Sequence, residues 1–128
     1  MTIEGDLLEA EPLTRAFGEA WDALGGLDIA LVAIGTLPDQ SGASVDVASS
    51  ETALRINFVS PSILAELLAQ RFDAAKKGTL AVITSVAGDR GRKSNYVYGA
   101  AKGGLQRLLQ GMRHRFARSD VRIVDVRP

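Results

Sequence analysis

The chain has 128 residues, of which 46% are hydrophobic, and equal numbers of acidic and basic side chains, so one globular domain of modest size is expected. The absence of cysteine excludes disulfides and thiolate chemistry and agrees with a cytoplasmic protein. A single histidine, His114, cannot form a metal site alone, and no metal is expected. The longest apolar run, residues 29–35, is too short to span a bilayer, and the acidic residues 1–11 do not resemble a secretion signal.

The charges are distributed unevenly along the sequence although the net charge is zero. Residues 1–75 carry twelve acidic and three basic side chains, whereas residues 76–128 carry three acidic and twelve basic ones. Two solvated faces of opposite sign would explain this distribution. Alternatively, the basic half attracts an anion such as a phosphorylated cofactor or substrate. The sequence leaves both explanations open.

The predicted elements alternate between helices and short apolar strands. The strands are continuously hydrophobic, which is typical of strands buried on both faces. Strands that alternate with helices predict right-handed crossovers, so the predicted fold is α/β, a parallel sheet with helices on both faces. The loops that follow strands lie at the carboxyl edge, where open α/β sheets bind ligands. In chain order the predicted elements are helix 11–24, strand 28–35, loop 36–50, helix 52–77, strand 79–85, loop 88–94, helix 95–118 and strand 121–126.

A phenol, an ammonium and a hydroxyl group are expected to meet at this edge. Tyr98 and Lys102 are four residues apart in the last predicted helix, so they share one helix face. An ammonium beside a phenol favours the phenolate, which suits an acid/base catalyst. Ser85 ends a strand thirteen residues before the tyrosine and is placed to hold a carbonyl oxygen. Asn57 interrupts an apolar helical segment, and taken alone it is most simply explained by hydrogen bonds to nearby backbone or water.

Taken together, these residues resemble the short-chain dehydrogenase/reductase family over essentially the whole chain. The resemblance implies that the chain corresponds to the central to C-terminal part of a Rossmann-type fold of this family. The matches occur in the family's order and spacing. They are the strand 28–35 at the family's Asn-Asn-Ala-Gly turn, Asn57 within Ile-Asn-Phe-Val, Ser85-Val-Ala-Gly88 at the catalytic serine, Tyr98-Gly-Ala-Ala-Lys102 at the Tyr-x-x-x-Lys signature, and Val126-Arg-Pro128 at the last strand.

The resemblance implies a nicotinamide-dependent interconversion of a ketone and a secondary alcohol, with a small-molecule substrate. Tyr98 would exchange the proton with the substrate oxygen, and Ser85 would stabilise that oxygen. Lys102 would bind the nicotinamide ribose and favour the phenolate, while Asn57 would hold a water molecule of a proton relay. The cofactor would be NAD or NADP, and the residues implied to contact it are Asp6, Leu7, Val32, Ala33, Gly35, Tyr98, Lys102 and Pro128.

Two departures from the family pattern concern the cofactor. At the Asn-Asn-Ala-Gly turn this chain has Val32-Ala33-Ile34-Gly35, so only the glycine is retained. The sequence also has no Gly-x-x-x-Gly-x-Gly loop, which in the family cradles the pyrophosphate. Residues 1–128 are therefore expected to form a partial NAD(P)-binding domain that lacks the glycine-rich start and the substrate region. The choice between NAD and NADP does not follow from these residues.

Two functions follow from these observations. The first is a ketone reductase, and residues 35–40 and 85–98 are similar to a branch of the family that reduces a keto-sugar phosphate. The second is a truncated, inactive remnant that serves only as an association module. In the family, the helices matching 52–77 and 95–118 form a subunit interface, which predicts a homo-oligomer. Nucleic-acid binding is not expected, because the basic loop has no interleaved aromatic residues.

Overall fold

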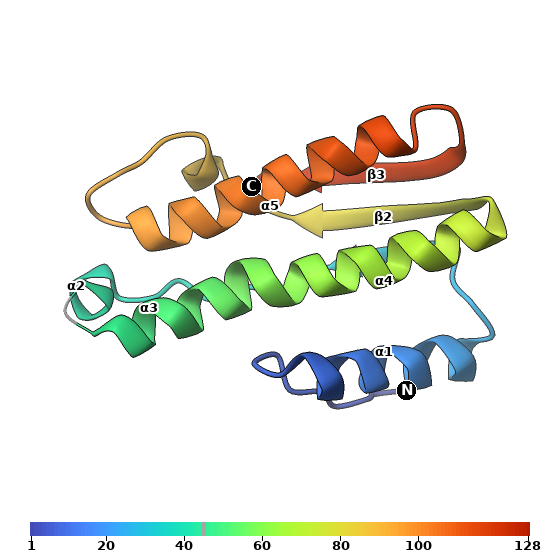
Figure 1. Cartoon of the computed structure of the whole chain (residues 1–128), viewed down its shortest axis with the longest axis horizontal. Coiled ribbons are helices and arrows are strands. Elements are labelled where there is room, and N and C mark those ends of the chain that lie inside the picture. The colour runs from blue at the N-terminus through green and yellow to red at the C-terminus, as the bar shows by residue number, and fades with distance from the viewer. Residues whose placement is uncertain (45) are drawn as a thin grey trace.

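The computed structural model describes residues 1–44 and 46–128. None of the helices in this described part is long and apolar enough to cross a membrane. The elements, in chain order, are α1 (Ala10–Leu24), β1 (Ile29–Val32), α2 (Gln40–Ala43), α3 (Val47–Leu54), the π-helical turn η1 (Arg55–Val59), α4 (Ser60–Ala75), β2 (Lys77–Ile83), the 3-10 turn η2 (Val86–Gly88), α5 (Tyr96–Arg115) and β3 (Asp120–Val126) (Figure 1).

Within the described residues, the strands form a parallel sheet in the order β1-β2-β3. Val32 at the end of β1 pairs with Val82, and Ile83 at the end of β2 pairs with Val126. The strands therefore end together at one edge of the sheet. The predicted α/β class and the parallel sheet are confirmed.

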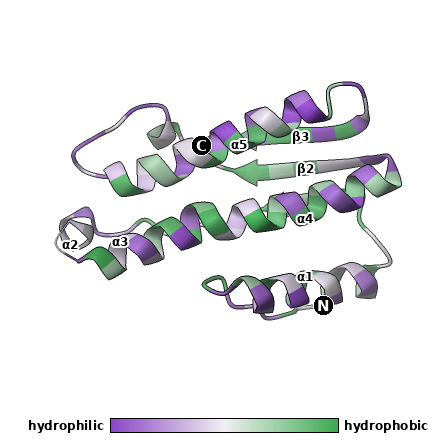
Figure 2. Ribbon diagram, in the orientation of Figure 1, coloured by the Kyte–Doolittle hydropathy of each residue, from purple (hydrophilic) through white to green (hydrophobic). Residues whose placement is uncertain are grey.

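The helices α4 and α5 lie side by side on one face of the sheet, and α1 packs against α4 (Figure 1). The hydrophobic core fills the space between these helices and the strands. Figure 2 shows hydrophobic and hydrophilic residues alternating along α4 and α5, as expected for helices that bury one side. Fully buried members of the core are Phe72, Leu80, Val82, Leu105 and Leu109.

The opposite face of the sheet is open in the described part of the chain. Ile29 and Leu31 of β1 are 69% and 60% exposed, and Val124 and Val126 of β3 are exposed as well. Among the described residues, the predicted helices are thus found on one face of the sheet and not on both. Continuous hydrophobicity shows that both faces of a strand are apolar, but it does not show what covers each face.

The predicted loop over residues 36–50 is wrong, because it contains α2 and the first turn of α3. Both helices begin at an aspartate whose carboxylate accepts hydrogen bonds from the first turn. Asp39 accepts from the backbone nitrogen of Ser41 at 3.1 Å, and Asp46 accepts from that of Ala48 at 3.1 Å. The caps are present in the sequence, but the surrounding Gly, Ser and Asp residues favoured a loop prediction.

The helix predicted over residues 52–77 starts earlier, is interrupted by η1 and ends at Ala75. Lys76 closes α4 in the left-handed conformation, with φ at 60°. Gly78 follows with φ at 142°, and a Cβ there would lie 2.2 Å from the ring of Phe72. Only glycine fits this position, since both its backbone conformation and the buried ring exclude a side chain.

We expect Gly78→Ala to lower the free energy of unfolding by roughly 2–4 kcal/mol, because the new methyl group adds backbone strain and displaces Phe72 from the core. Urea denaturation followed by circular dichroism measures this change. The matched control is Gly111→Ala on the exposed side of α5, where a Cβ would meet no atom within 4 Å. That control is expected to be neutral or to stabilise by up to about 1 kcal/mol. Equal stabilities for the two variants would contradict the prediction.

Candidate active site

The candidate site lies at the carboxyl edge of the sheet, where β1 and β2 end and where η1 packs against α5. The strand predicted over 28–35 ends at Val32, and the strand predicted over 79–85 ends at Ile83. The chain leaves the sheet at these points because the β1–β2 pairing stops at Val32. Gly35 and Ser85 therefore lie just beyond the strands, in the segments that form the edge.

Lys102 is a buried ammonium group held by backbone carbonyls. Its side chain is almost completely buried on α5, and Nζ donates hydrogen bonds to the carbonyl oxygens of Ile34 (3.0 Å) and Ile83 (3.2 Å). Burial lowers the pKa of Lys102, since its charge is removed from water. The two hydrogen bonds use two of the three donors of an ammonium group, which leaves a donor for a ligand.

Asn57 is fully buried in η1, and its amide binds backbone groups on two segments. Nδ2 donates to the carbonyl oxygens of Ala53 and Thr36, both at 2.9 Å, while Oδ1 accepts from the backbone nitrogen of Thr36 at 3.0 Å. The amide thus has the backbone partners that the simpler interpretation of this residue predicts. It also fixes the segment that leaves β1 against the π-helical turn.

The side chains of Asn57 and Lys102 both lie close to Gly35. A Cβ at this glycine would lie 3.1 Å from Oδ1 of Asn57 and 3.1 Å from Nζ of Lys102. Both contacts are tighter than ordinary van der Waals contact, so a side chain at this position would push the segment away from the two polar groups. This close approach gives a physical reason for the glycine at the end of Val-Ala-Ile-Gly.

Tyr98 lies on α5 one turn before Lys102 and is partly buried. Nζ of Lys102 is 5.9 Å from the centre of the tyrosine ring, so the two side chains lie on the same face of the helix. Both line a cavity of about 250 Å³ whose other walls are residues 33–37, Ile83 and Thr84. The structure therefore places Tyr98, Lys102, Ala33 and Gly35 around one cavity.

Ser85 directly precedes η2, and hydrogen bonds join it to η2 and to α5. Its Oγ accepts a hydrogen bond from the backbone nitrogen of Ala87 at 3.2 Å. Its carbonyl oxygen accepts one from Nε2 of Gln106 on α5 at 2.7 Å. The turn that contains Ser85 is thus joined to the helix that carries Tyr98.

Glycines allow η2 and α5 to make direct backbone contact. A Cβ at Gly99 would lie 2.7 Å from the carbonyl oxygen of Ala87, and one at Gly88 would lie 2.6 Å from the backbone nitrogen of Gly103. Gly99 directly follows Tyr98, and Gly103 directly follows Lys102. This packing was not predicted from the sequence, although a glycine directly after Tyr98 and another directly after Lys102 could have indicated it.

The remaining residues implied to contact a cofactor lie elsewhere. Val32 is buried in the hydrophobic core, and Pro128 is exposed beyond the end of β3. Asp6 is exposed and accepts a hydrogen bond from the backbone nitrogen of Leu8 at 2.8 Å, while the carbonyl oxygen of Leu7 accepts one from the hydroxyl of Ser60. Within the described chain, none of Asp6, Leu7, Val32 and Pro128 lines the cavity beside Tyr98.

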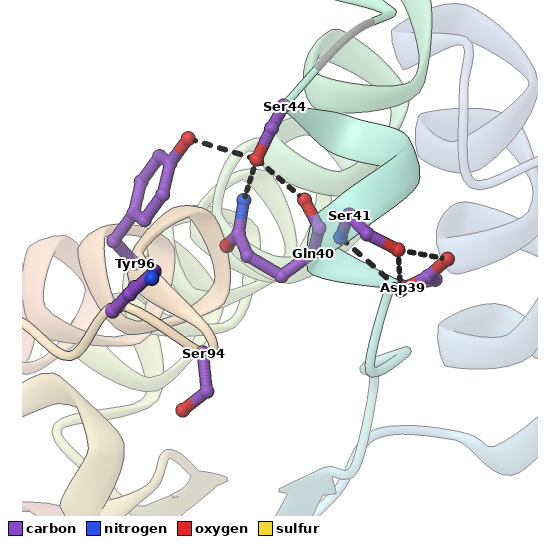
Figure 3. Close-up of a pocket in the computed structure, with 7 residues that line it drawn as sticks. Asp39, Gln40, Ser41, Ser44, Ser94 and Tyr96 are labelled. Carbon is purple, nitrogen blue, oxygen red and sulfur yellow. Dashed lines mark hydrogen bonds between the residues drawn. The ribbon is translucent and has the colours of Figure 1, made fainter.

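A larger groove of about 730 Å³ combines the two segments predicted as loops (Figure 3). Lys93, Ser94 and Tyr96 form one side, and residues of the α2 region form the other. Arg90, Arg92 and Lys93 are exposed, and the predicted loop 88–94 begins within η2. Sequence analysis placed both segments at the ligand-binding edge but did not identify the groove residues on the α2 side, which are Asp39, Gln40, Ser41 and Ser44.

Known proteins are similar to this chain in both sequence and fold. An uncharacterized oxidoreductase of Mycobacterium tuberculosis is 36% identical over 104 residues, which cover 81% of this chain and 42% of that protein. A 2-dehydro-3-deoxy-D-gluconate 5-dehydrogenase of Formosa agariphila is 29% identical over 105 residues, which cover 82% of this chain and 40% of that protein.

A solved structure, 4-hydroxyisoleucine dehydrogenase complexed with NADH, matches with a TM-score of 0.84 at 26% identity and covers 96% of this chain and 51% of that one. The chain thus spans about half or less of the length of these relatives. The family model described as short chain dehydrogenase matches residues 1–128. On this evidence, the chain belongs to the short-chain dehydrogenase family.

Proposed function

We propose that this chain carries the proton-transfer site of a nicotinamide-dependent oxidoreductase that interconverts a ketone and a secondary alcohol. The observation behind this proposal is the convergence of Asn57 and Lys102 on Gly35, beside the cavity that Tyr98 lines. Family membership supports the reaction class, and the NADH in one solved relative supports the cofactor class.

Tyr98 would donate the proton to the carbonyl oxygen during reduction and accept it during oxidation. The positive charge of Lys102 on the same helix face would favour the phenolate that remains after donation. The hydroxyl of Ser85 would donate a hydrogen bond to the substrate oxygen. Its Oγ accepts a hydrogen bond from Ala87, and no described hydrogen bond uses its proton. Asn57 would keep the segment after β1 in place and hold a water molecule beside Lys102.

NAD or NADP would supply or accept the hydride. The third donor of Lys102 and the hydroxyl of Tyr98 would suit the hydroxyl groups of a nicotinamide ribose, because both side chains line the same cavity. Ala33 would line the same side, whereas Asp6, Leu7, Val32 and Pro128 would act at the edges of the cofactor or beneath it. The sequence has no Gly-x-x-x-Gly-x-Gly loop, so the proposal assigns no residue to the diphosphate.

A keto-sugar is the substrate class that we propose. The relative from Formosa agariphila is a dehydrogenase of a sugar acid by its name. Residues 35–40 and 85–98 resemble the reductase subunit of decaprenylphosphoryl-ribose 2-epimerase, which reduces a lipid-linked keto-sugar phosphate. The hydroxyls of Ser41, Ser44, Ser94 and Tyr96 in the adjacent groove would suit a substrate rich in hydroxyl groups.

Association without catalysis is the second candidate function. The exposed apolar side chains Ile29 and Leu31 favour it, because apolar groups gathered on a surface are typical of interfaces. A homo-oligomer through the segments 52–77 and 95–118 belongs to this proposal and is compatible with an active enzyme as well. The effect of Tyr98→Phe on kcat distinguishes the two functions.

We expect Tyr98→Phe to lower kcat for ketone reduction by roughly 10²–10³-fold, because the proton donor is lost, while the KM for the nicotinamide changes less than about threefold. Steady-state kinetics with a keto-sugar and NADH or NADPH measures both constants. Tyr96→Phe removes the same oxygen two residues away and is expected to lower kcat by less than about tenfold. An unchanged kcat in Tyr98→Phe would contradict the proposed function and favour association alone.

We expect the stability that Lys102 contributes, compared with Lys102→Met, to increase as pH rises. The pKa of Lys102 is lowered in the folded chain, so the unfolded chain binds more protons between the folded-state pKa and the ordinary lysine value. Below that range the buried charge costs stability, and the cost is relieved as pH rises through the folded-state pKa. Urea denaturation of both chains at pH 7 and pH 10 measures the difference. A difference that shrinks with rising pH would show that the ammonium is stabilised, and not destabilised, by its surroundings.

A further inference from the structure

The groove residue Gln40 contacts α5 one residue before Tyr98. We propose that Gln40 is a positioning residue, which holds the first turn of α5 and thereby the hydroxyl of Tyr98. The proposal rests on the function proposed above, because the position of Tyr98 matters only if Tyr98 transfers a proton. Figure 3 shows Gln40 in the groove, with its side chain directed toward Tyr96 at the start of α5.

The first turn of α5 receives its hydrogen-bond acceptor from a distant segment. The backbone N–H groups of a first helical turn have no partners within the helix. Among the described residues, Asn95 at the start of α5 makes no side-chain capping hydrogen bond. Instead, the backbone nitrogen of Val97 donates to Oε1 of Gln40 at 3.0 Å, across 57 residues of sequence. Gln40 thus acts as a cap on the turn that contains Tyr98.

The amide of Gln40 is held in a single orientation by a closed hydrogen-bond network (Figure 3). Gln40 is only 8% exposed, and Nε2 donates to Oγ of Ser44 at 3.3 Å. Oγ of Ser44 donates to the carbonyl oxygen of Gln40 at 2.6 Å and lies 3.1 Å from the hydroxyl of Tyr96. Because Ser44 has a single proton and uses it on Gln40, the hydroxyl of Tyr96 is the donor of the last bond.

The same segment also holds the other candidate residues. Lys102 binds the carbonyl oxygen of Ile34, and Asn57 binds both backbone groups of Thr36. Gln40 follows a few residues later and accepts a hydrogen bond from Val97, in the turn that contains Tyr98. Residues 34–40 therefore connect Asn57, Lys102 and the first turn of α5. Loss of the Gln40 contact would release only the turn of Tyr98, since the other two connections would remain.

Gln40→Met and Gln40→Glu separate the role of the acceptor from the role of the side chain's bulk. Methionine fills the same space without an acceptor, whereas a glutamate carboxylate still accepts from Val97 and suits a helix N-terminus. We expect Gln40→Met to speed amide hydrogen exchange at Val97 by about tenfold and to lower kcat by about tenfold, with the KM for the nicotinamide within about twofold. Gln40→Glu is expected to stay within about threefold of the wild type in both rates.

The controls use the folded chain and a matched substitution. Gln70→Met makes the same chemical change on the exposed side of α4 and is expected to alter neither rate. Tyr96→Phe keeps the buried amide and removes only its outer partner, so it tests the proposal if Gln40→Met does not fold. We expect it to speed exchange at Val97 and to lower kcat, each by about threefold.

Several outcomes would overturn the proposal. Unchanged exchange at Val97 in Gln40→Met, or equal loss in Gln40→Glu and Gln40→Met, would show that Gln40 does not hold the turn as an acceptor. Faster exchange with an unchanged kcat would show that the turn does not position Tyr98. A wild-type chain without reductase activity would contradict the proposed function instead, and exchange at Val97 would still decide whether Gln40 holds the turn.

Discussion

The burial of one ammonium group determines how the site is assembled. Lys102 is removed from water, and its described hydrogen bonds go to two neutral carbonyls, those of Ile34 and Ile83. A buried charge without hydrogen bonds costs stability, so the two bonds of Lys102 favour keeping both strand ends and α5 in their relative positions. Gly35 lets the segment after β1 approach close enough for these bonds to form. The buried ammonium thus joins the segments that follow β1 and β2 to the helix that carries Tyr98.

The site is therefore built from connections between backbone segments more than from contacts between catalytic side chains. The amide of Asn57 forms hydrogen bonds with Thr36 and Ala53. The two oxygens of Ser85 accept hydrogen bonds from Ala87 and Gln106. These bonds fix the exits of β1 and β2 against η1 and α5. In the chemistry that we propose, Tyr98 exchanges a proton with the substrate, and its helix is joined to the surrounding segments through Gln40 and Gln106.

Local patterns in the sequence were enough to predict the α/β order, the parallel sheet and the shared face of Tyr98 and Lys102. These features depend on hydrophobic periodicity and on helix spacing, which are properties of short segments. The caps at Asp39 and Asp46 were also local but were outweighed by the loop-like composition around them. The contact between Gln40 and Val97 joins residues far apart in the sequence, and nothing in either segment alone indicates it. The open face of the sheet was not predictable either, because strand composition does not report what lies next to a face.

The contact between η2 and α5 has a consequence for how such a site can change. Main-chain atoms of Ala87 and Gly88 meet those of Gly99 and Gly103 with no side chain between them. The spacing between the serine turn and the tyrosine helix is thus set by atomic radii, and rotamer changes cannot adjust it. Apart from Gln40, the groove residues of the α2 region and of the segment before α5 have no such restriction, since they meet the groove through their side chains. In the function that we propose, substrate preference could therefore change through these residues while the geometry of proton transfer stays constant.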